Sequence, residues 1–525
     1  FVKNRLTNRP KFAAKPIEYI LFFRLEAIFL LPVNSGGHTA YQNFVTENLR
    51  KYYPNPNALA RSTWDIIERF WNLDLSYTDE LLADKYSKFG PVPRTPSCMQ
   101  RSYLLSIDFK VSSLTQWAAQ LKINPLYAIL SGFEFGDTPG VGTFYDFLNR
   151  LWDSAEDNLS SHEHPLKKKK VKKPKKKGEK AESVEKITVA ELLPQLENTT
   201  FYLDEQPYAS LFKIYKQEFL DVSVSKNLIH PNSLALAGDG TPVLTSHRER
   251  KKRICDCKEK GILNCDCNRY YSQPDCDIGW DSSNDRWYHG YDLYMLVDSQ
   301  SDLPVFPLFS CASKHDSHGF LHTFFRMKSF LPDYTVSKIL LDSAHDAMAY
   351  YQYFKRENIT PFIDLNGKGG RPPVYKNDFT IDTDGVPICP AGQRMHRDGG
   401  EAAKGRMKFK CPEMHRKNGC ISCTCETPCS DAKYGRTVHL VLKDNPRLFN
   451  DPPRSSKEWK LDYNARTSVE RSNKREKIAF NLESGRHRST KMWYCRLYHI
   501  LMLQHLDAWD LPTESPLKKL IQQTA

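Results

Sequence analysis

The sequence predicts an α/β domain with a cysteine-rich insertion, preceded by a helical N-terminal region. Three observations support this fold class. From about residue 230 onward, short apolar runs typical of strands alternate with segments at helical spacing. Residues 91–155 carry apolar residues at helical spacing only, separated by turn residues. The 14 cysteines of the 525-residue chain are strongly clustered, which favours reduced thiols that hold metal over a disulfide scaffold.

The composition excludes several classes of protein. Hydrophobic residues make up 40% and charged residues 26%, so we expect a folded chain rather than a largely disordered one. The formal net charge of +13 favours polyanionic partners. The most apolar run, residues 17–33, contains Arg24 and Glu26 and is shorter than a comfortable bilayer span, so no membrane association is expected.

Helical features come first along the chain. Ser113 is placed to cap a helix over 114–121, and a Gly/Pro-rich loop at 136–142 is followed by Thr143 as a second expected cap. Short helices separated by tight turns suit a DNA-binding module, and a helical accessory domain is an equally good interpretation.

A lysine-rich tract follows the helical region. Nine lysines lie between Lys167 and Lys177, where like charges repel and little can be buried, so we expect a disordered linker. Such a tract suits phosphate contact or nuclear localisation, but a plain solvated tether is commoner. The expected segments are an unassigned region at 1–90, a helical DNA-binding region at 91–155, the linker at 156–190, the α/β domain at 191–510 with its insertion at about 366–455, and a tail at 511–525.

The α/β domain has a recognisable order of expected elements. Apolar runs predict three consecutive strands, then a helix, a strand, a helix and a last strand. This is the order of an RNase H-like domain. The predicted strands are 234–237, 291–297, 305–309, 339–341 and 359–363, and the predicted helices are 318–330 and a segment capped by Ser343 that runs to Phe354.

Two aspartates follow predicted strands directly. Asp239 comes after the first strand and Asp342 after the fourth, at strand ends where α/β sheets usually place their sites. Asp346 and Asp364 are alternatives for the second carboxylate. Asp342 is favoured because it ends an apolar strand, whereas Asp364 follows a strand beyond a helix.

A third carboxylate lies in a helical segment near the C-terminal side. At 100° per residue, Tyr463, Arg466, Glu470 and Lys477 fall within a wedge of about 60° on one helix. Three converging carboxylates repel one another unless a cation neutralises them, and hard oxygen ligands suit Mg²⁺ or Mn²⁺. Two such ions can activate the attacking oxygen and stabilise the leaving oxygen of a phosphodiester displacement.

These residues resemble the DDE transposases of bacterial insertion sequences. Tyr463, Arg466, Glu470 and Lys477 match in full the signature Y-x2-R-x3-E-x6-K of one branch of that family. Four further segments are similar to the family's first-aspartate strand, second strand, second-aspartate strand and preceding helical region. They are 237–241, 289–294, 340–346 and 138–147.

The resemblance implies a function and a site. Asp239, Asp342 and Glu470 would form a metal-binding triad for hydrolysis at transposon ends and strand transfer into target DNA. Double-stranded DNA, a homodimer on that DNA and a cytoplasmic, nucleoid-associated location are implied with it. A non-catalytic DNA-binding protein derived from a transposase, and a plain RNase H-like nuclease, remain alternatives. The expected phosphate contacts are Tyr463, Arg466, Lys477, Arg471 and Lys474.

Two cysteine sets suggest structural zinc. Cys255, Cys257, Cys265 and Cys267 form a C-x-C-x7-C-x-C pattern that a hairpin could gather into a tetrahedron. The second set lies in the 128-residue gap between Asp342 and Glu470, and reduced, partly buried cysteines are its alternative interpretation. Its predicted zinc ligands are Cys389, Cys411, Cys420 and either Cys423 or Cys429.

Overall fold

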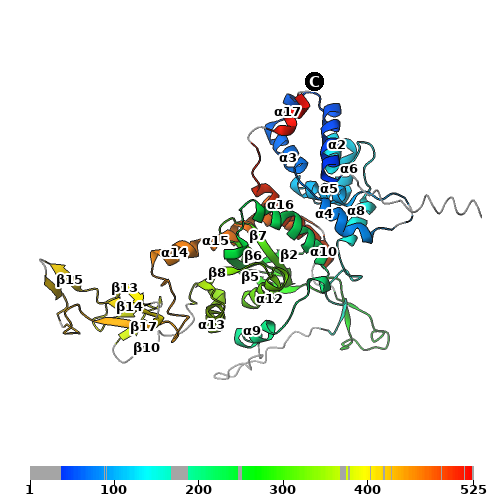
Figure 1. Ribbon diagram of the computed structural model, residues 1–525. Coiled ribbons are helices and arrows are strands. Elements are labelled where there is room, and N and C mark those ends of the chain that lie inside the picture. The colour runs from blue at the N-terminus through cyan, green and yellow to red at the C-terminus, as the bar shows by residue number, and fades with distance from the viewer. Residues whose placement is uncertain are drawn as a thin grey trace, which may run out of the picture. The chain divides into compact units, whose positions relative to one another are not determined.

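The chain folds into two units in the computed structural model, with boundaries between residues 151 and 152 and between residues 510 and 511 (Figure 1). Residues 152–510 form one unit, and residues 1–151 with 511–525 form the other. The structure describes residues 37–87, 89, 91–166, 187–245, 251–366, 374–375, 379–382, 384–401, 404–417, 420–426, 428–485, 487–512 and 515–522. In these ranges no helix has the length and apolarity needed to cross a membrane.

The first unit is helical. The prediction of a helical N-terminal region is confirmed, and helices also form within 37–82 and 516–522, where none is predicted from the sequence. Ser113 caps α6, since its side chain accepts a hydrogen bond from the backbone N–H of Gln116. The expected cap at Thr143 is wrong, because α8 begins at Val141 and Thr143 lies inside it. The helices of this unit are α2 (Gly37–Tyr52), α3 (Arg61–Trp71), α4 (Ser76–Leu82), α5 (Pro96–Asp108), α6 (Leu114–Ile123), α7 (Pro125–Ser131), α8 (Val141–Arg150) and α17 (Pro516–Gln522).

A six-stranded sheet forms the centre of the second unit. Its order is β5-β6-β2-β8-β9, and β7 also pairs with β6. β2 is antiparallel to β6 and parallel to β8, and β8 is parallel to β9. The strands are β2 (Leu234–Leu244), β5 (Asp277–Asp281), β6 (Arg286–Asp298), β7 (Pro304–Cys311), β8 (Val336–Leu341) and β9 (Thr360–Ile363). The predicted sequence of strands and helices is therefore confirmed, with β5 added before β6.

Helices cover both faces of this sheet. On β6, Tyr291 packs against Trp493 of α16 (Thr490–Ala508), whereas Tyr294 packs against Phe320 of α12 (Asp316–Phe330). Side chains at odd and even positions of a strand point to opposite faces, so α16 and α12 lie on opposite sides of the sheet (Figure 1). The other helices of this unit are α9 (Val189–Glu197), α10 (Ala209–Tyr215), α11 (Asp221–Ser225), α13 (Met348–Arg356), α14 (Lys457–Asn464) and α15 (Thr467–Lys474).

The cysteine-rich insertion consists of short antiparallel strands. Met407, Phe409 and Leu440 are buried in a small core of its own. The strands form three small sheets: β10 (Val374–Tyr375), β11 (Phe379–Ile381) and β12 (Pro387–Ile388); β13 (His396–Glu401), β14 (Arg406–Lys410) and β17 (Thr437–Val441); and β15 (Met414–Lys417) with β16 (Cys420–Cys423).

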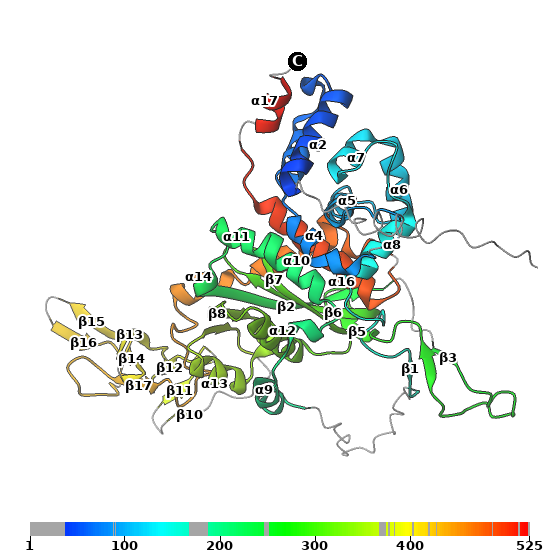
Figure 2. The ribbon, with the colours of Figure 1, turned by 45° about the vertical axis from the view of Figure 1, so that its right-hand side comes forward.

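A further small sheet carries the first cysteine set. β4 (Arg269–Tyr271) lies between β1 (Glu163–His164) and β3 (Lys251–Arg253) in this sheet. The four cysteines lie in the loop of the β3–β4 hairpin, and β1 and β3 are labelled in Figure 2. The lysine-rich tract predicted as a disordered linker lies outside the described residues.

Candidate active site

Asp239 and Asp342 lie on neighbouring parallel strands at the same level. The register places Ala237 of β2 beside Leu340 of β8, and each aspartate comes two residues later. Because paired strands are about 4.8 Å apart, carboxylates at one level lie close together. Asp239 does not follow its strand as expected, since β2 stays paired with β6 as far as Leu244.

The electrostatic surroundings of Asp239 disfavour its negative charge. Burial raises the pKa of Asp239 to about 7, and the nearby carboxylates of Asp342 and Asp316 add to the increase, while Arg466 and His345 oppose it. Among the described residues, no hydrogen-bond donor reaches the Asp239 carboxylate. An acid in this position is best satisfied by a cation.

Asp342 is held by its own loop. Its Oδ1 accepts hydrogen bonds from the backbone N–H of Ala344 at 3.0 Å and from Nδ1 of His345 at 2.6 Å. Burial acts to raise its pKa, but the His345 contact and the Ala344 bond hold the pKa of Asp342 below its ordinary value. Asp342, not Ser343, therefore caps the turn Ser343–His345, and α13 begins only at Met348.

The two alternative acids occupy different positions. Asp346 binds Arg447 through both carboxylate oxygens, at 2.8 and 2.5 Å, and its side chain is fully buried. Asp364 directly follows β9. Because Ile363 of β9 lies beside Leu341 of β8, Asp364 lies at the level of Asp342, and its side chain is exposed. Asp346 is thus committed to an ion pair, whereas Asp364 adjoins the pair of aspartates.

The predicted single helix is broken between its first two signature residues. Tyr463 lies in α14, α15 starts at Thr467, and Lys477 lies in the π-helical turn η8 (Arg475–Ala479). Backbone bonds from Ala465 to Asp462 and from Arg466 to Tyr463 span three residues instead of four, which tightens the turn here. The expected 60° wedge on one continuous α-helix is therefore wrong.

Arg466 links Glu470 to the aspartates. Its Nη2 donates to Glu470 Oε1 at 2.5 Å, and its charge acts on both Asp239 and Asp342. The Arg466 guanidinium also lies 5.9 Å from the Tyr463 ring centre, and burial raises the pKa of Tyr463 to about 12. The Glu470 side chain is 49% exposed, so Glu470 borders the site from its solvent side.

Three other predicted phosphate contacts differ in their surroundings. Arg471 binds both oxygens of Asp302 at 2.6 Å. Lys477 donates to the carbonyl of Pro242 and lies 3.7 Å from Glu483. Lys474 is exposed on α15. Of the three, Lys474 is the side chain best placed to meet a ligand from solvent.

Sequence reasoning missed two acids beside this site. A Cβ built on Gly240 would lie 2.5 Å from Oδ1 of Asp316 and 3.1 Å from Oδ1 of Asp292. Asp292 is buried, and its Oδ2 has no hydrogen-bond partner among the described residues. Asp316 stands in the first turn of α12, where an acid is so common that no sequence signal marks it.

The carboxylates surround the site without closing on one point. In the part of the chain that the structure describes, only Cys255, Cys257, Cys265 and Cys267 bring three or more ligand atoms within 4.8 Å of one another. Arg466 connects the carboxylates instead, since it donates to Glu470 and its charge acts on both aspartates.

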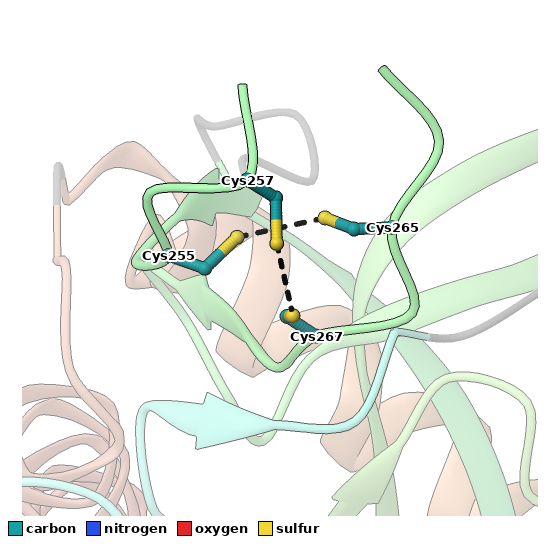
Figure 3. Close-up of side chains that lie close together, drawn as sticks. All are labelled: Cys255, Cys257, Cys265 and Cys267. Atoms are coloured by element: carbon teal, nitrogen blue, oxygen red, sulfur yellow. Dashed lines mark hydrogen bonds between the residues drawn. The ribbon is translucent and has the colours of Figure 1, made fainter. Parts of the chain in front are cut away.

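The first cysteine set forms a compact group of four thiols. Cys255 and Cys265 are 3.5 Å apart and Cys257 and Cys267 are 3.6 Å apart, with all four side chains pointing toward one another (Figure 3). Arg269 donates to Sγ of Cys265 at 3.2 Å, and this contact lowers the pKa of Cys265 to about 6. A thiolate is thus favoured at Cys265, whereas the contact with Cys267 raises the pKa of Cys257 to about 12. Cys276, which the sequence offers as a spare ligand for this set, instead donates to Oε1 of Gln273.

The second cysteine set is described only in part. Cys389 and Cys411 are buried, and Cys429 is partly exposed. Cys420 and Cys423 lie on β16, but their side chains are outside the described part of the structure. Zinc binding by this set stays a prediction.

A buried acid beside the site predicts a pH-dependent stability. Glu476 of η8 is fully buried, accepts a bond from Gln504 at 3.3 Å, and has a pKa raised to about 8 by burial. The folded protein keeps this proton up to about pH 8, whereas the unfolded chain loses it near 4.5, so stability falls as pH rises between these values. We expect Glu476→Gln to unfold at a higher urea concentration than wild type at pH 9, with a smaller difference at pH 5. Equal midpoints at pH 9 would contradict this.

Comparison with known protein families settles the class of this chain. A family model described as a transposase DDE domain matches residues 235–504, which is more than half of the chain. The chain belongs to the DDE transposase family. The match begins in β2 and ends in α16, so it contains Asp239, Asp342 and Glu470 of this transposase, and the prediction of the family is confirmed. A search of curated proteins finds no match.

Proposed function

We propose that this DDE transposase hydrolyses phosphodiester bonds at transposon ends and joins the freed 3′ hydroxyl to target DNA. The observation that carries the proposal is the position of Asp239 and Asp342 at one level of two parallel strands, within the span of the family match. Glu470 adjoins them through Arg466. The strand order β7-β6-β2-β8-β9, with three antiparallel and then two parallel strands, favours an RNase H-like fold.

The residues of the site fit a divalent cation. The Asp239 carboxylate has no donor among the described residues, and two acids on paired strands leave oxygen ligands of the kind that Mg²⁺ and Mn²⁺ prefer. Asp239, Asp342 and Glu470 would hold the ion. When bound, it would supply the charge that stabilises the attacking and leaving oxygens. Arg466, released from the carboxylates, would orient a phosphate, and the exposed Lys474 would contact the DNA backbone.

The partner that follows from this chemistry is double-stranded DNA. A net charge of +13 favours a polyanion, and two transposon ends must be brought together for joining, so we infer a homodimer on DNA. In a bacterial cell such an enzyme would act at the nucleoid in the cytoplasm.

A product assay tests this function against its alternatives. The full chain is incubated with Mg²⁺ and a DNA fragment that carries the transposon ends, and nicked and joined products are separated on a denaturing gel. We expect both products, and neither with Asp239→Ala, Asp342→Ala or Glu470→Ala. DNA binding without nicks would identify a non-catalytic DNA-binding protein, and nicks without joining would identify a nuclease.

We also propose that Cys255, Cys257, Cys265 and Cys267 hold a structural zinc ion. In a tetrahedral site with Zn–S bonds of about 2.3 Å, sulfurs are separated by about 3.8 Å, close to the spacing of these thiols. The buried Arg269, which donates to Cys265, would offset the negative charge of four thiolates.

Zinc content provides a direct measurement. We expect the purified protein to contain a zinc ion that the double variant Cys257→Ser/Cys267→Ser loses, because two thiolates cannot close the tetrahedron. Inductively coupled plasma mass spectrometry reports the stoichiometry. Cys276→Ser is the matched control, since Cys276 lies outside the group of four. Equal zinc in the double variant and wild type would assign the metal elsewhere.

A further inference from the structure

Asp342 is supported by a pair of buried side chains that lie deeper in the protein. Nδ1 of His345 donates to Oδ1 of Asp342 at 2.6 Å, and the hydroxyl of Tyr294 is 2.9 Å from Nε2 of the same imidazole. His345 and Tyr294 are both buried. We propose that Tyr294 and His345 are positioning residues for Asp342, and that they leave its Oδ2 as the oxygen that meets a divalent cation. This inference rests on the proposed function, because it assumes that Asp342 binds the ion.

The hydrogen-bond directions follow from the donors available. An ionised carboxylate can only accept, so Nδ1 of His345 carries the proton that is donated to Asp342, and Nε2 on the other side of the ring pairs with the hydroxyl of Tyr294. The Tyr294 hydroxyl therefore holds the imidazole in the orientation that directs Nδ1 to Asp342. With the N–H of Ala344 as a second donor, Oδ1 is fully engaged, and no bond from the described residues reaches Oδ2.

The fold provides the space that Tyr294 needs. Tyr294 lies opposite Gly240 in the β2–β6 register. A Cβ on Gly238 would lie 2.9 Å from its hydroxyl oxygen, and a Cβ on Gly319 of α12 would lie 3.0 Å from its ring. Side chains at these two glycines would displace the tyrosine. The ring is also held edge-on against Phe320, with 6.0 Å between ring centres.

Hydrogen bonds of this kind determine how a carboxylate is oriented toward a metal ion. Carboxylates that bind metal are oriented by hydrogen bonds to their outer side, and loss of these partners typically lowers metal affinity by about 10- to 100-fold. Rotation of the Asp342 carboxylate would break both bonds to Oδ1. The bonds to Oδ1 therefore leave a single, preoriented oxygen, Oδ2, without a hydrogen bond from the described residues.

The test measures Mn²⁺ binding to the full chain without DNA, by electron paramagnetic resonance of free Mn²⁺. We expect Tyr294→Phe and His345→Ala to raise the Kd by about 10-fold or more. His345→Asn should recover most of the affinity, because its amide N–H can replace the Nδ1 donor. Tyr350→Phe is the matched control: Tyr350 is also buried, its hydroxyl bonds to the carbonyl of Ser317, and it does not contact Asp342.

Mn²⁺ binding by the Asp342→Asn variant distinguishes a failure of the positioning role from a failure of the proposed function. If Asp342→Asn weakens Mn²⁺ binding but Tyr294→Phe and folded His345 variants do not, the positioning role is overturned and the proposed function stands. If Asp342→Asn leaves Mn²⁺ binding unchanged, the proposed function fails with it. An effect of Tyr350→Phe equal to that of Tyr294→Phe would also overturn the inference, because it would reflect core packing alone.

Discussion

Replacing Asp342 with asparagine is expected to lower the rate of DNA cleavage by about 1,000-fold or more, while DNA binding changes little. The substitution keeps the size of the side chain and an oxygen for Ala344, but removes the charge that a divalent cation needs. Cleavage of a labelled transposon-end duplex under single-turnover conditions gives the rate, and a gel-shift titration gives the affinity.

Asp364→Asn is the informative comparison for that measurement. Asp364 lies beside Asp342 at the end of the next parallel strand, and it is also an aspartate. We expect less than a 10-fold effect on cleavage, because Asp364 is exposed and lies one strand farther from Asp239 than Asp342 does. If Asp364→Asn abolished cleavage and Asp342→Asn did not, the second carboxylate of the site would be Asp364.

The largest expected effect on stability comes from a neighbouring acid. The side chain of Asp346 is fully buried and binds Arg447 through two bonds, at 2.8 and 2.5 Å, with a further bond from the Tyr351 hydroxyl. Asp346→Ala leaves the Arg447 charge without its partner, so the free energy of unfolding should fall by about 3 kcal/mol. Urea denaturation followed by tryptophan fluorescence measures this as a lower midpoint.

An exposed ion pair serves as the control for Asp346. Asp384 pairs with Arg394 while 47% of each side chain is exposed, so Asp384→Ala should cost less than about 1 kcal/mol. Equal losses for Asp346→Ala and Asp384→Ala would show that the buried pair contributes no special stability.

The sheet and its two aspartates could be predicted because their signals are local. β2 begins with a short apolar run just before Asp239, and β8 ends in one directly before Asp342, as buried strands require. The four cysteines of the first set could also be predicted, since their ligand spacing is contained within one hairpin.

The features that could not be predicted depend on packing between distant segments. The break between α14 and α15 contains neither glycine nor proline, so no residue type marks it. Asp316 approaches Asp239 only because α12 crosses β2 at Gly240. The true extent of β2 depends on β6, which extends the pairing past Asp239.

Because α17 belongs to the first unit, the folding of that unit depends on the last part of the chain to be synthesised. Glu68 of α3 is buried, and its carboxylate accepts from the N–H of Leu517 at 3.1 Å and from the hydroxyl of Ser515. The ribosome translates the whole of 152–510 between these partners. The N-terminal helices therefore gain the α17 partners of Glu68 only after residues 152–510 have been synthesised, so the first unit reaches its final packing late in translation.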